Sequence, residues 1–303
     1  MKLFPRAALI ALASSVAITI TACSSTTSAI GEDPAAADVP QTIAVMDPGA
    51  VDTIDALGDG DKIVGVALQS SLPDYLSAYQ GGEVADLGSH QEPDLERLAE
   101  LDPDLVIVGF RTAELKDQLS RNFNVIDVTY DQTMPFYEGV EYSTTMIAEV
   151  LDRQDEADAQ LQELRDAIDE AKETSATDLS AMVLMTSGGK VSIHGADSRY
   201  GAIYHDLGYQ PAVSEVAEGS HGDPISFEAI QEANPGILFV IDRDATIGEE
   251  GANAQATLDN DLVRSTDAWT NDRVVYLDGS RWYVTIHGVN NAVEMIREAT
   301  VEP

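Results

Sequence analysis

The stretch ERLAELDPDLVIVGFR, residues 96–111, contains a helix pattern, a break and a strand pattern in succession, and it returns without a gap as EAIQEANPGILFVIDR at residues 228–243. In each copy an amphipathic helix stops at Asp-Pro or Asn-Pro, because the residue before a proline is disfavoured in the helical region. An apolar strand follows, and an arginine, Arg111 or Arg243, closes it. The repeated unit predicts two similar halves built from α/β layers.

Short apolar runs elsewhere in the chain fit strands of the same two halves, alternating with helical segments. Ligands of open α/β sheets bind at the carboxyl ends of the strands, so both repeat arginines are expected at the ligand-binding edge. Gly188 and Gly189 ahead of Lys190 predict a hairpin turn. The expected strands are 42–46, 62–67, 105–110 and 125–128 in the first half, and 181–185, 237–241 and 274–277 in the second.

Residues 152–178, DRQDEADAQLQELRDAIDEAKETSATD, separate the halves and contain no glycine or proline. Leu161, Leu164 and Ile168 fall on one stripe of a helix whose other faces are polar. A coiled coil is the alternative, but the stripe lasts only about three turns, short of several heptads. The pattern predicts an N-terminal lobe at 41–151, a bridging helix at 152–178 and a C-terminal lobe at 179–303.

The N-terminus carries an export pattern, in which the basic residues Lys2 and Arg6 precede an uncharged apolar run that ends just before Cys23. Residues 1–22 resemble a bacterial lipoprotein signal, although Ile20 stands where leucine is usual. The resemblance implies cleavage before Cys23, lipidation there and an extracytoplasmic protein anchored to the cell membrane. An ordinary secretory signal or a short membrane anchor is the alternative, but the only cysteine has no disulfide partner. Residues 23–40 are small and polar, which predicts a flexible tether.

The chain is strongly acidic, with 53 Asp and Glu against 17 Lys and Arg and a net charge of −36. This charge argues against nucleic acid or an anionic membrane surface as a partner. No G-x-S-x-G, GxxxxGK[ST], H-E-x-x-H or C-x-x-C motif occurs, so the sequence does not support an enzyme. A receptor for free metal ions needs clustered ligands, whereas the histidines are scattered as His90, His194, His205, His221 and His287.

Four segments of the chain carry a resemblance to one family, and they are PDLERLAELDPDLVIVGFR (93–111), VSIHGADSRYGAIYHDLGYQP (191–211), ISFEAIQEANPGILFVIDRDATIG (225–248) and LDNDLVRSTDAWTNDRVVYLDGSRWYV (258–284). Together they resemble the substrate-binding lipoproteins of iron-siderophore ABC importers, most closely their catecholate branch, and the resemblance covers nearly all of residues 41–303. It implies a class III periplasmic-binding-protein-like fold, in which two Rossmann-like α/β lobes are joined by a single long α-helix.

The function implied by this resemblance is capture of a ferric siderophore and its delivery to an inner-membrane ABC permease and its ATPase. The protein is then expected to act as a monomer, to use no cofactor and to touch the membrane through its lipid anchor alone. A haem- or corrinoid-binding protein of a related importer is the alternative, since the same architecture serves those ligands. The sequence does not identify the siderophore.

The resemblance places a ligand-holding arginine triad at Arg111, Arg199 and Arg243. Physical chemistry gives its own reason, because a ferric catecholate is an anion with delocalised charge, and arginine offers five donors, a permanent charge and a planar face that stacks on rings. Arg199 also lies beside an expected helix N-terminus, which favours anions. Each arginine could instead be a surface or ion-paired residue of an acidic chain.

In part of the catecholate branch a loop histidine and a tyrosine fill iron sites that the siderophore leaves open, and the resemblance places these at His221 and Tyr283. Imidazole and phenolate are both competent ligands for ferric iron. A solvated surface histidine is the alternative for His221. The segment TIHG departs from the glycines usual in the family, so His287 is expected to crowd or extend the pocket. Trp282 is expected to stack on a catechol or to pack in the core.

Docking to the importer is expected at one exposed glutamate on each lobe, and the resemblance places these at Glu96 and Glu228. They open the two repeat copies. Equivalent positions on two similar lobes would meet a two-fold importer symmetrically. The composition lends these two residues no special weight, since an acidic chain has solvated glutamates everywhere.

Overall fold

Five parallel strands form the N-terminal sheet, in the order β3-β2-β1-β4-β5. The computed structural model describes residues 39–303 except 68–71, 90, 218 and 220, so the predicted signal peptide, Cys23 and nearly all of the tether lie outside the described residues. Buried runs such as Leu-Val-Ile-Val in β4 suit strands that are covered on both faces. The strands are β1 (Ile43–Val45), β2 (Ile63–Val66), β3 (Ala85–Asp86), β4 (Leu105–Val108) and β5 (Val125–Asp127).

The C-terminal sheet is mixed, in the order β11-β10-β6-β7-β9, with β8 beside β6. The pair β6–β7 is antiparallel and turns through Gly188 and Gly189, whose φ angles of 57° and 70° suit a tight hairpin turn. This confirms the predicted turn. The strands are β6 (Ser180–Ser187), β7 (Lys190–His194), β8 (Gln210–Pro211), β9 (Asp223–Pro224), β10 (Ile237–Asp242) and β11 (Val274–Leu277).

The sequence repeat is also a structural repeat. Its first copy is helix α2 (Leu95–Leu101) followed by β4, and its second is α6 (Phe227–Ala233) followed by β10. Both helices end in the left-handed region, at Asp102 with φ 44° and Asn234 with φ 42°, and a proline follows each. Asp and Asn tolerate this conformation better than other side chains with a Cβ. Each strand then occupies an inner position in its sheet.

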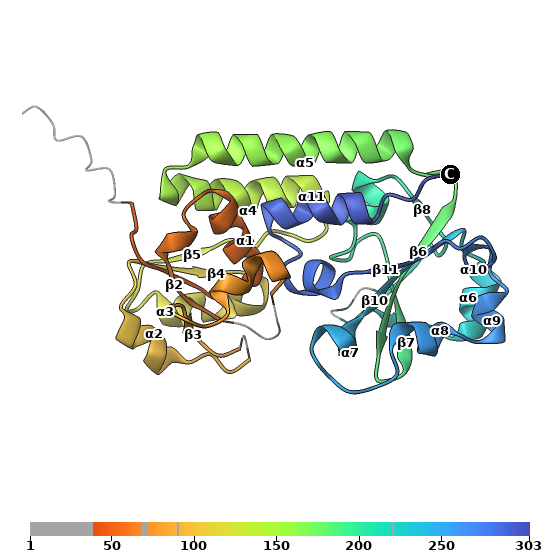
Figure 1. The fold of residues 1–303 in the computed structure, drawn as a ribbon, viewed down its shortest axis with the longest axis horizontal. Helices are drawn as coiled ribbons and strands as arrows, with labels where there is room; N and C mark the ends of the chain where they lie inside the picture. Colours follow the sequence, from red (N-terminus) through yellow and green to blue (C-terminus); the bar gives the residue numbers. More distant parts are fainter. Residues whose placement is uncertain (1–38, 68–71, 90, 218, 220) are drawn as a thin grey trace, which may run out of the picture. The chain divides into compact units, whose positions relative to one another are not determined.

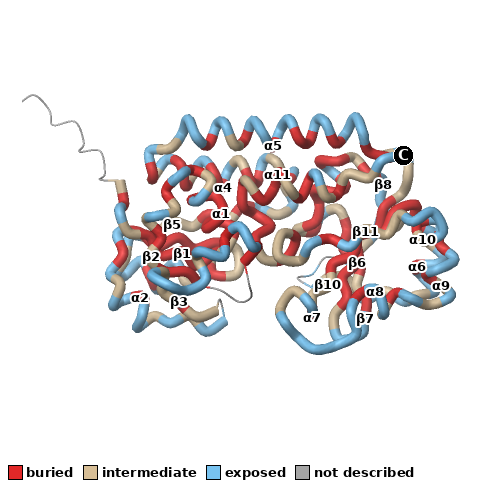
Figure 2. The backbone as a smooth tube through the Cα atoms, in the orientation of Figure 1, coloured by how far each residue is buried: buried red, intermediate tan, exposed pale blue. Residues whose placement is uncertain are grey.

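Helix α5 (Gln154–Thr174) extends along one side of both sheets together with α4 (Phe136–Leu151) and α11 (Val289–Glu298) (Figure 1). It begins later than the predicted helix, because Asp152 takes the left-handed conformation that ends α4, and it ends earlier, at Thr174, because Ser175 is extended. Its apolar stripe is buried and its outer face is exposed (Figure 2). Two α/β lobes joined by one long helix match the predicted fold class. Residues 39–303 form one compact unit, so the predicted lobe boundaries stay a prediction.

Helix α11 returns from the C-terminal lobe to α1 (Pro48–Ala56) of the N-terminal lobe. The buried carboxylate of Asp52 accepts hydrogen bonds from the amides of Asn290 and Asn291 at 2.9 and 3.0 Å, and so caps the N-terminus of α11. Tyr75 donates a further hydrogen bond to the same carboxylate. No helix within the described ranges is long and apolar enough to span a membrane.

Short helices complete the described chain, and several of them begin at the carboxyl ends of strands. Two are single π-helical turns, η4 and η5, which is a conformation found often at functional sites. The short helices are η1 (Gly60–Lys62), η2 (Asp74–Tyr79), η3 (Phe110–Leu115), α3 (Lys116–Leu119), η4 (Ala202–Asp206), α7 (Arg243–Thr246), α8 (Ala254–Leu258), α9 (Asp261–Arg264), α10 (Asp267–Thr270) and η5 (Ser280–Val284).

Candidate functional site

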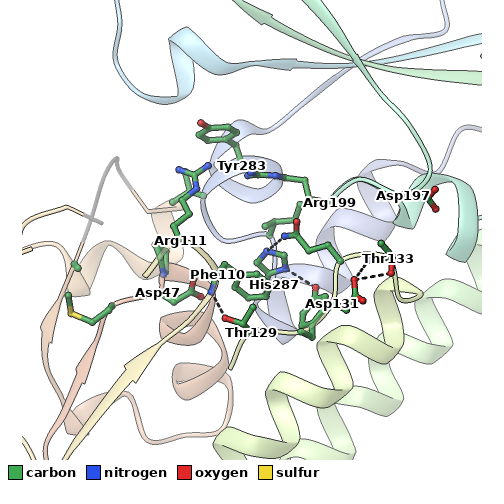
Figure 3. Close-up of a pocket in the computed structure, with 17 residues that line it drawn as sticks. Asp47, Phe110, Arg111, Thr129, Asp131, Thr133, Asp197, Arg199, Tyr283 and His287 are labelled. Atoms are coloured by element: carbon green, nitrogen blue, oxygen red, sulfur yellow. Dashed lines mark hydrogen bonds between the residues drawn. The ribbon is translucent and has the colours of Figure 1, made fainter. Parts of the chain in front are cut away.

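A cavity of about 560 Å³ lies at the carboxyl ends of the N-terminal strands and is closed by segments of the C-terminal lobe (Figure 3). Asp47 follows β1, Phe110 and Arg111 follow β4, and the loop 129–133 follows β5. This is the edge at which ligands of open α/β sheets bind. Two segments of the C-terminal lobe contribute Asp197, Arg199, Tyr283, Val284, Ile286 and His287.

Tyr283 lies at the meeting point of all three predicted arginines. The guanidinium carbon of Arg111 is 4.8 Å from the centre of the Tyr283 ring and that of Arg199 is 5.5 Å from it, both within cation–π range. Arg243 donates from Nε to the Tyr283 hydroxyl at 3.3 Å. Residues far apart in the sequence thus form one cationic cluster around one phenol, and Figure 3 shows the guanidinium groups of Arg111, on the left, and Arg199, on the right, beside the Tyr283 ring.

The arginines change the acidity of this phenol. Burial would raise the pKa of Tyr283, but the charge of Arg111, hydrogen bonds from Arg243 and Arg111 and the charge of Arg243 outweigh burial and lower it. A lowered pKa makes the phenolate more accessible near neutral pH. A phenolate is a hard anionic oxygen, which is the type of donor that ferric iron prefers. The cluster therefore offers both cations for an anionic ligand and one oxygen suited to iron.

Arg243 contacts Tyr283 but does not itself line the cavity. It is the first residue of α7, and its Nη1 donates to Ser187 Oγ at 3.2 Å. The same nitrogen lies 3.5 Å from Asp244 Oδ1 and 3.6 Å from Glu249 Oε2. These partners hold the guanidinium in place. Its geometry is suited to supporting the phenol of Tyr283, and a ligand in the cavity would meet Arg111 and Arg199 first.

Asp47 is a cavity residue that the sequence analysis did not identify. It is buried and caps α1 by accepting a hydrogen bond from the Ala50 amide at 3.1 Å. Burial raises the pKa of Asp47 to about 6, against the lowering effects of the Ala50 and Gly49 amides and of Arg111. The signal was present in the sequence, since Asp47-Pro48 matches a helix cap followed by proline.

Trp282 packs in the core and does not line the cavity. Its side chain is 0 % exposed within the core of the C-terminal lobe, and Nε1 donates to Glu298 Oε2 at 2.8 Å. The π-helical turn η5 turns Tyr283 toward the cavity and its neighbour Trp282 into the core. Of the two roles expected for Trp282, the structure shows packing in the core, and contact with the ligand stays a prediction that the geometry does not favour.

His221 is exposed in the loop before β9 and does not line the cavity. Glu218 and Ser220 beside it are outside the described residues. Tyr283 lines the cavity and His221 does not, and iron ligation by this pair stays a prediction. Among the residues that the structure describes, no group of three or more His, Cys, Asp or Glu is arranged to hold a metal ion.

Glu96 and Glu228 occupy equivalent places in the two repeat copies. Each lies exposed in the first turn of its helix, Glu96 in α2 and Glu228 in α6. Asp94 and Ser226 cap these helices in the same way, each by accepting from the amide three residues on. The predicted docking residues are thus accessible and structurally matched, and their role stays a prediction.

Residues 43–280 match the family described as "Periplasmic binding protein". The chain belongs to this family. It is 35% identical over 260 residues to the petrobactin-binding protein YclQ of Bacillus subtilis, an alignment that covers 86% of this chain and 81% of that protein. It is 32% identical over 251 residues to the ferric-anguibactin-binding protein FatB of Vibrio anguillarum, covering 81% and 77% of the two chains.

Solved structures agree with these sequence relatives. The crystal structure of the petrobactin-binding protein superimposes with a TM-score of 0.82 at 34% identity, covering 86% of this chain and 91% of that one. The periplasmic catecholate-siderophore binding protein VctP of Vibrio cholerae gives a TM-score of 0.79 at 32% identity, covering 86% and 93%. These matches confirm the predicted family and the two-lobe fold of the described chain.

Proposed function

We propose that this protein captures a ferric siderophore, of the catecholate type, outside the cytoplasm and delivers it to an ABC importer. The observation that carries the proposal is the convergence of Arg111, Arg199 and Arg243 on Tyr283 at the edge of the cavity. Two relatives above 30% identity are named for binding petrobactin and ferric anguibactin. A solved structure above 30% identity is named for catecholate siderophores.

The cavity chemistry fits an anionic, aromatic iron complex. Arg111 and Arg199 present delocalised charges that pair with phenolate oxygens and stack on catechol rings. Such hydrogen bonds to charged groups contribute about 1.5–3 kcal/mol each. Arg243 supports the cluster from behind through the Tyr283 hydroxyl.

Tyr283 is proposed to ligate iron when the siderophore supplies too few donors, with His221 as a second ligand from its loop. The lowered pKa of Tyr283 favours the phenolate that such a bond requires. For a tetradentate bis-catecholate, Tyr283→Phe and His221→Ala are then expected to lose affinity and charge-transfer colour. A hexadentate tris-catecholate is expected to bind both variants as it binds the wild type. Equal losses with both ligands would assign the two residues to packing.

Delivery is proposed to use Glu96 and Glu228 as contacts for arginines on the permease subunits, and the lipid on Cys23 as the membrane anchor. The protein itself is proposed to bind and release its ligand without chemistry. Its partners are then the siderophore, the permease and the attached ATPase.

The test is a titration of the mature chain with ferric catecholates, a ferric hydroxamate, haem and cobalamin, followed by quenching of Trp269 and Trp282 fluorescence. We expect the catecholates to bind most tightly. A neutral hydroxamate that binds more tightly than every catecholate would contradict the ligand class. Haem and cobalamin complexes would reveal themselves by their own absorption bands and would favour the alternative ligand.

A further inference from the structure

Three rings from three distant segments form the floor of the cavity. His287 follows η5, Phe110 follows β4, and Tyr130 follows β5. The ring of His287 stacks on that of Phe110, with 3.5 Å between centroids and 10° between planes. Tyr130 meets both rings edge-on, 5.0 Å from Phe110 and 5.2 Å from His287. Figure 3 shows His287 and Phe110 together on the floor between the two arginine-bearing segments.

Phe110 has an unusual backbone conformation that determines where Arg111 points. Its φ angle is 45°, in the left-handed region that a bulky side chain adopts only when its surroundings hold it there. Its amide donates to Thr129 Oγ1 at 2.7 Å, which holds the backbone of Phe110. The stacked ring of His287 holds its side chain. Because Arg111 is the next residue, a change of the Phe110 φ angle to a negative value would turn the Arg111 guanidinium away from the cavity.

His287 is bound to the N-terminal lobe through both ring nitrogens. Nδ1 lies 2.7 Å from the Tyr130 hydroxyl, and Nε2 lies 3.4 Å from Nε2 of Gln132. Each ring nitrogen thus has a polar partner within hydrogen-bonding distance, and the tautomer of His287 decides which member of each pair donates. Burial, followed by the charges of Arg199 and Arg111, holds the pKa of His287 well below its usual range, so the ring is neutral.

A neutral, buried ring with both nitrogens occupied is suited neither to pairing with an anion nor to ligating iron. We propose that His287 is a positioning residue, which stacks on Phe110 and hydrogen-bonds Tyr130 so that the strained turn aims Arg111 at the bound ferric catecholate. This inference rests on the proposed function, and it identifies a role for a cavity residue that the proposed function leaves without one.

The first experiment compares binding of one hexadentate ferric tris-catecholate to wild type, His287→Ala and His287→Phe. An aromatic pair of this kind supports a loss of about 3- to 10-fold in affinity for His287→Ala. His287→Phe retains a ring that can stack on Phe110 and is expected to recover most of that loss. Tyr130→Phe keeps all three rings, removes one hydrogen bond and is expected to fall between wild type and His287→Ala.

The second experiment separates positioning from direct contact by a double-mutant cycle. If His287 acts through Arg111, His287→Ala weakens binding in the wild-type background and has no further effect in an Arg111→Ala background. The matched control is Tyr209→Phe, which does not line the cavity and removes the hydrogen bonds that the Tyr209 hydroxyl donates to the Ala299 carbonyl and accepts from the Val301 amide. It is expected to lower stability without changing affinity in either background.

An equal loss from His287→Ala in both backgrounds would overturn the proposal and show that His287 acts independently of Arg111. No loss in either background would overturn it as well. If His287→Ala does not fold, the cycle is run with His287→Phe and Tyr130→Phe, whose combined loss must also vanish without Arg111. Failure of the proposed function has a different signature, since wild type itself would then not bind the ferric tris-catecholate.

Discussion

The two copies of the repeat place equivalent arginines at the ends of equivalent strands and then use them differently. After β4 the chain turns through Phe110, with φ 45°, and Arg111 faces the cavity. After β10 the chain enters α7 directly, because Asp242 caps that helix by accepting from the Ala245 amide at 3.0 Å. Arg243 is thereby directed to Tyr283, Ser187 and Asp244. Sequence equivalence therefore fixes the position of a residue along a strand, whereas the turn that follows decides what its side chain contacts.

The largest expected effect is on siderophore affinity, and it should differ between alanine variants of Arg111 and Arg243. Arg111→Ala is expected to weaken binding of a ferric tris-catecholate by about 1.5–3 kcal/mol, the usual contribution of a hydrogen bond to a charged group. Arg243→Ala is expected to cost less, because Arg243 lies behind Tyr283. Isothermal titration of both variants measures the difference, with Arg111→Lys as a control that keeps the charge. Equal losses would mean that the two copies are functionally as well as structurally equivalent.

Both variants should also change the titration of Tyr283. Both arginines lower the pKa of this phenol, so removing either one is expected to raise it. The folded-state pKa lies below that of an unfolded tyrosine, so the phenol contributes stability at high pH that is lost as pH falls through the folded pKa. Ultraviolet difference titration of each variant against its Tyr283→Phe counterpart measures the shift. An unchanged tyrosine titration in both variants would contradict the cluster.

A second contrast lies at the ends of α2 and α6. Alanine at Asp102 or Asn234 is expected to cost about 1–2 kcal/mol of unfolding free energy, because both residues are left-handed. Asn234 should cost more, since it also bonds Asp267 through its side-chain nitrogen at 3.0 Å and its oxygen at 2.8 Å. Urea denaturation measures both. Glycine at Asp102 is the control and should be nearly neutral, whereas a cost there equal to that of alanine would argue against the backbone explanation.

The ionisation of Asp47 is expected to have a smaller effect on ligand affinity. The pKa of this carboxyl is raised, whereas that of Tyr283 is lowered. Because burial raises the pKa of Asp47 to about 6, its ionisation adds a negative charge to the cavity as pH rises through that value. Affinity for an anionic complex is expected to fall severalfold over this interval. Asp47→Asn keeps a helix-capping side chain and should remove this pH dependence. The folded-state pKa lies above the unfolded one, so Asp47 also favours folding at low pH, and this contribution is lost as pH rises through about 6.

The smallest expected effect on ligand affinity belongs to Glu96 and Glu228. Changing both to alanine should leave siderophore binding intact and depress uptake and ATPase stimulation, because charge pairs at an interface govern encounter and registry. Uptake of radioactive iron in cells at matched expression measures this. Exposed Asp166 and Asp169 of α5 offer a matched acidic pair, whose double alanine variant should transport normally. Normal transport by Glu96→Ala/Glu228→Ala would show that docking lies elsewhere.

Much of the fold was predictable because its determinants are local. The apolar stripe of α5, the Pro-punctuated repeat and the strand runs all follow from periodicity, and β11 begins and ends where it was expected. The arginine ends of β4 and β10 were predictable for the same reason. The resemblance supplied the three arginines and Tyr283 as separate site residues, and their convergence on Tyr283 is seen only in the folded chain.

The remaining features depend on contacts between distant segments. A positive φ at Phe110 has no signal in the sequence, because the residue is a poor choice for that conformation in isolation. The opposite orientations of Trp282 and Tyr283 follow from one π-helical turn, which adjacent aromatic residues do not reveal. The stacking of His287 on Phe110 joins residues that only the folded chain brings together.

The carboxylate of Asp52, which holds the start of α11 against the N-terminal lobe, has a consequence for how ligand enters and leaves. Helix α5 is one connection between the lobes, and this contact is a second. Hinge bending would therefore require breaking the hydrogen bonds that the amides of Asn290 and Asn291 donate to Asp52. We expect the radius of gyration in solution to stay nearly constant as ligand binds. Capture would then proceed at the rate of diffusional encounter, and the energy that dislodges the cargo would come from ATP hydrolysis in the importer.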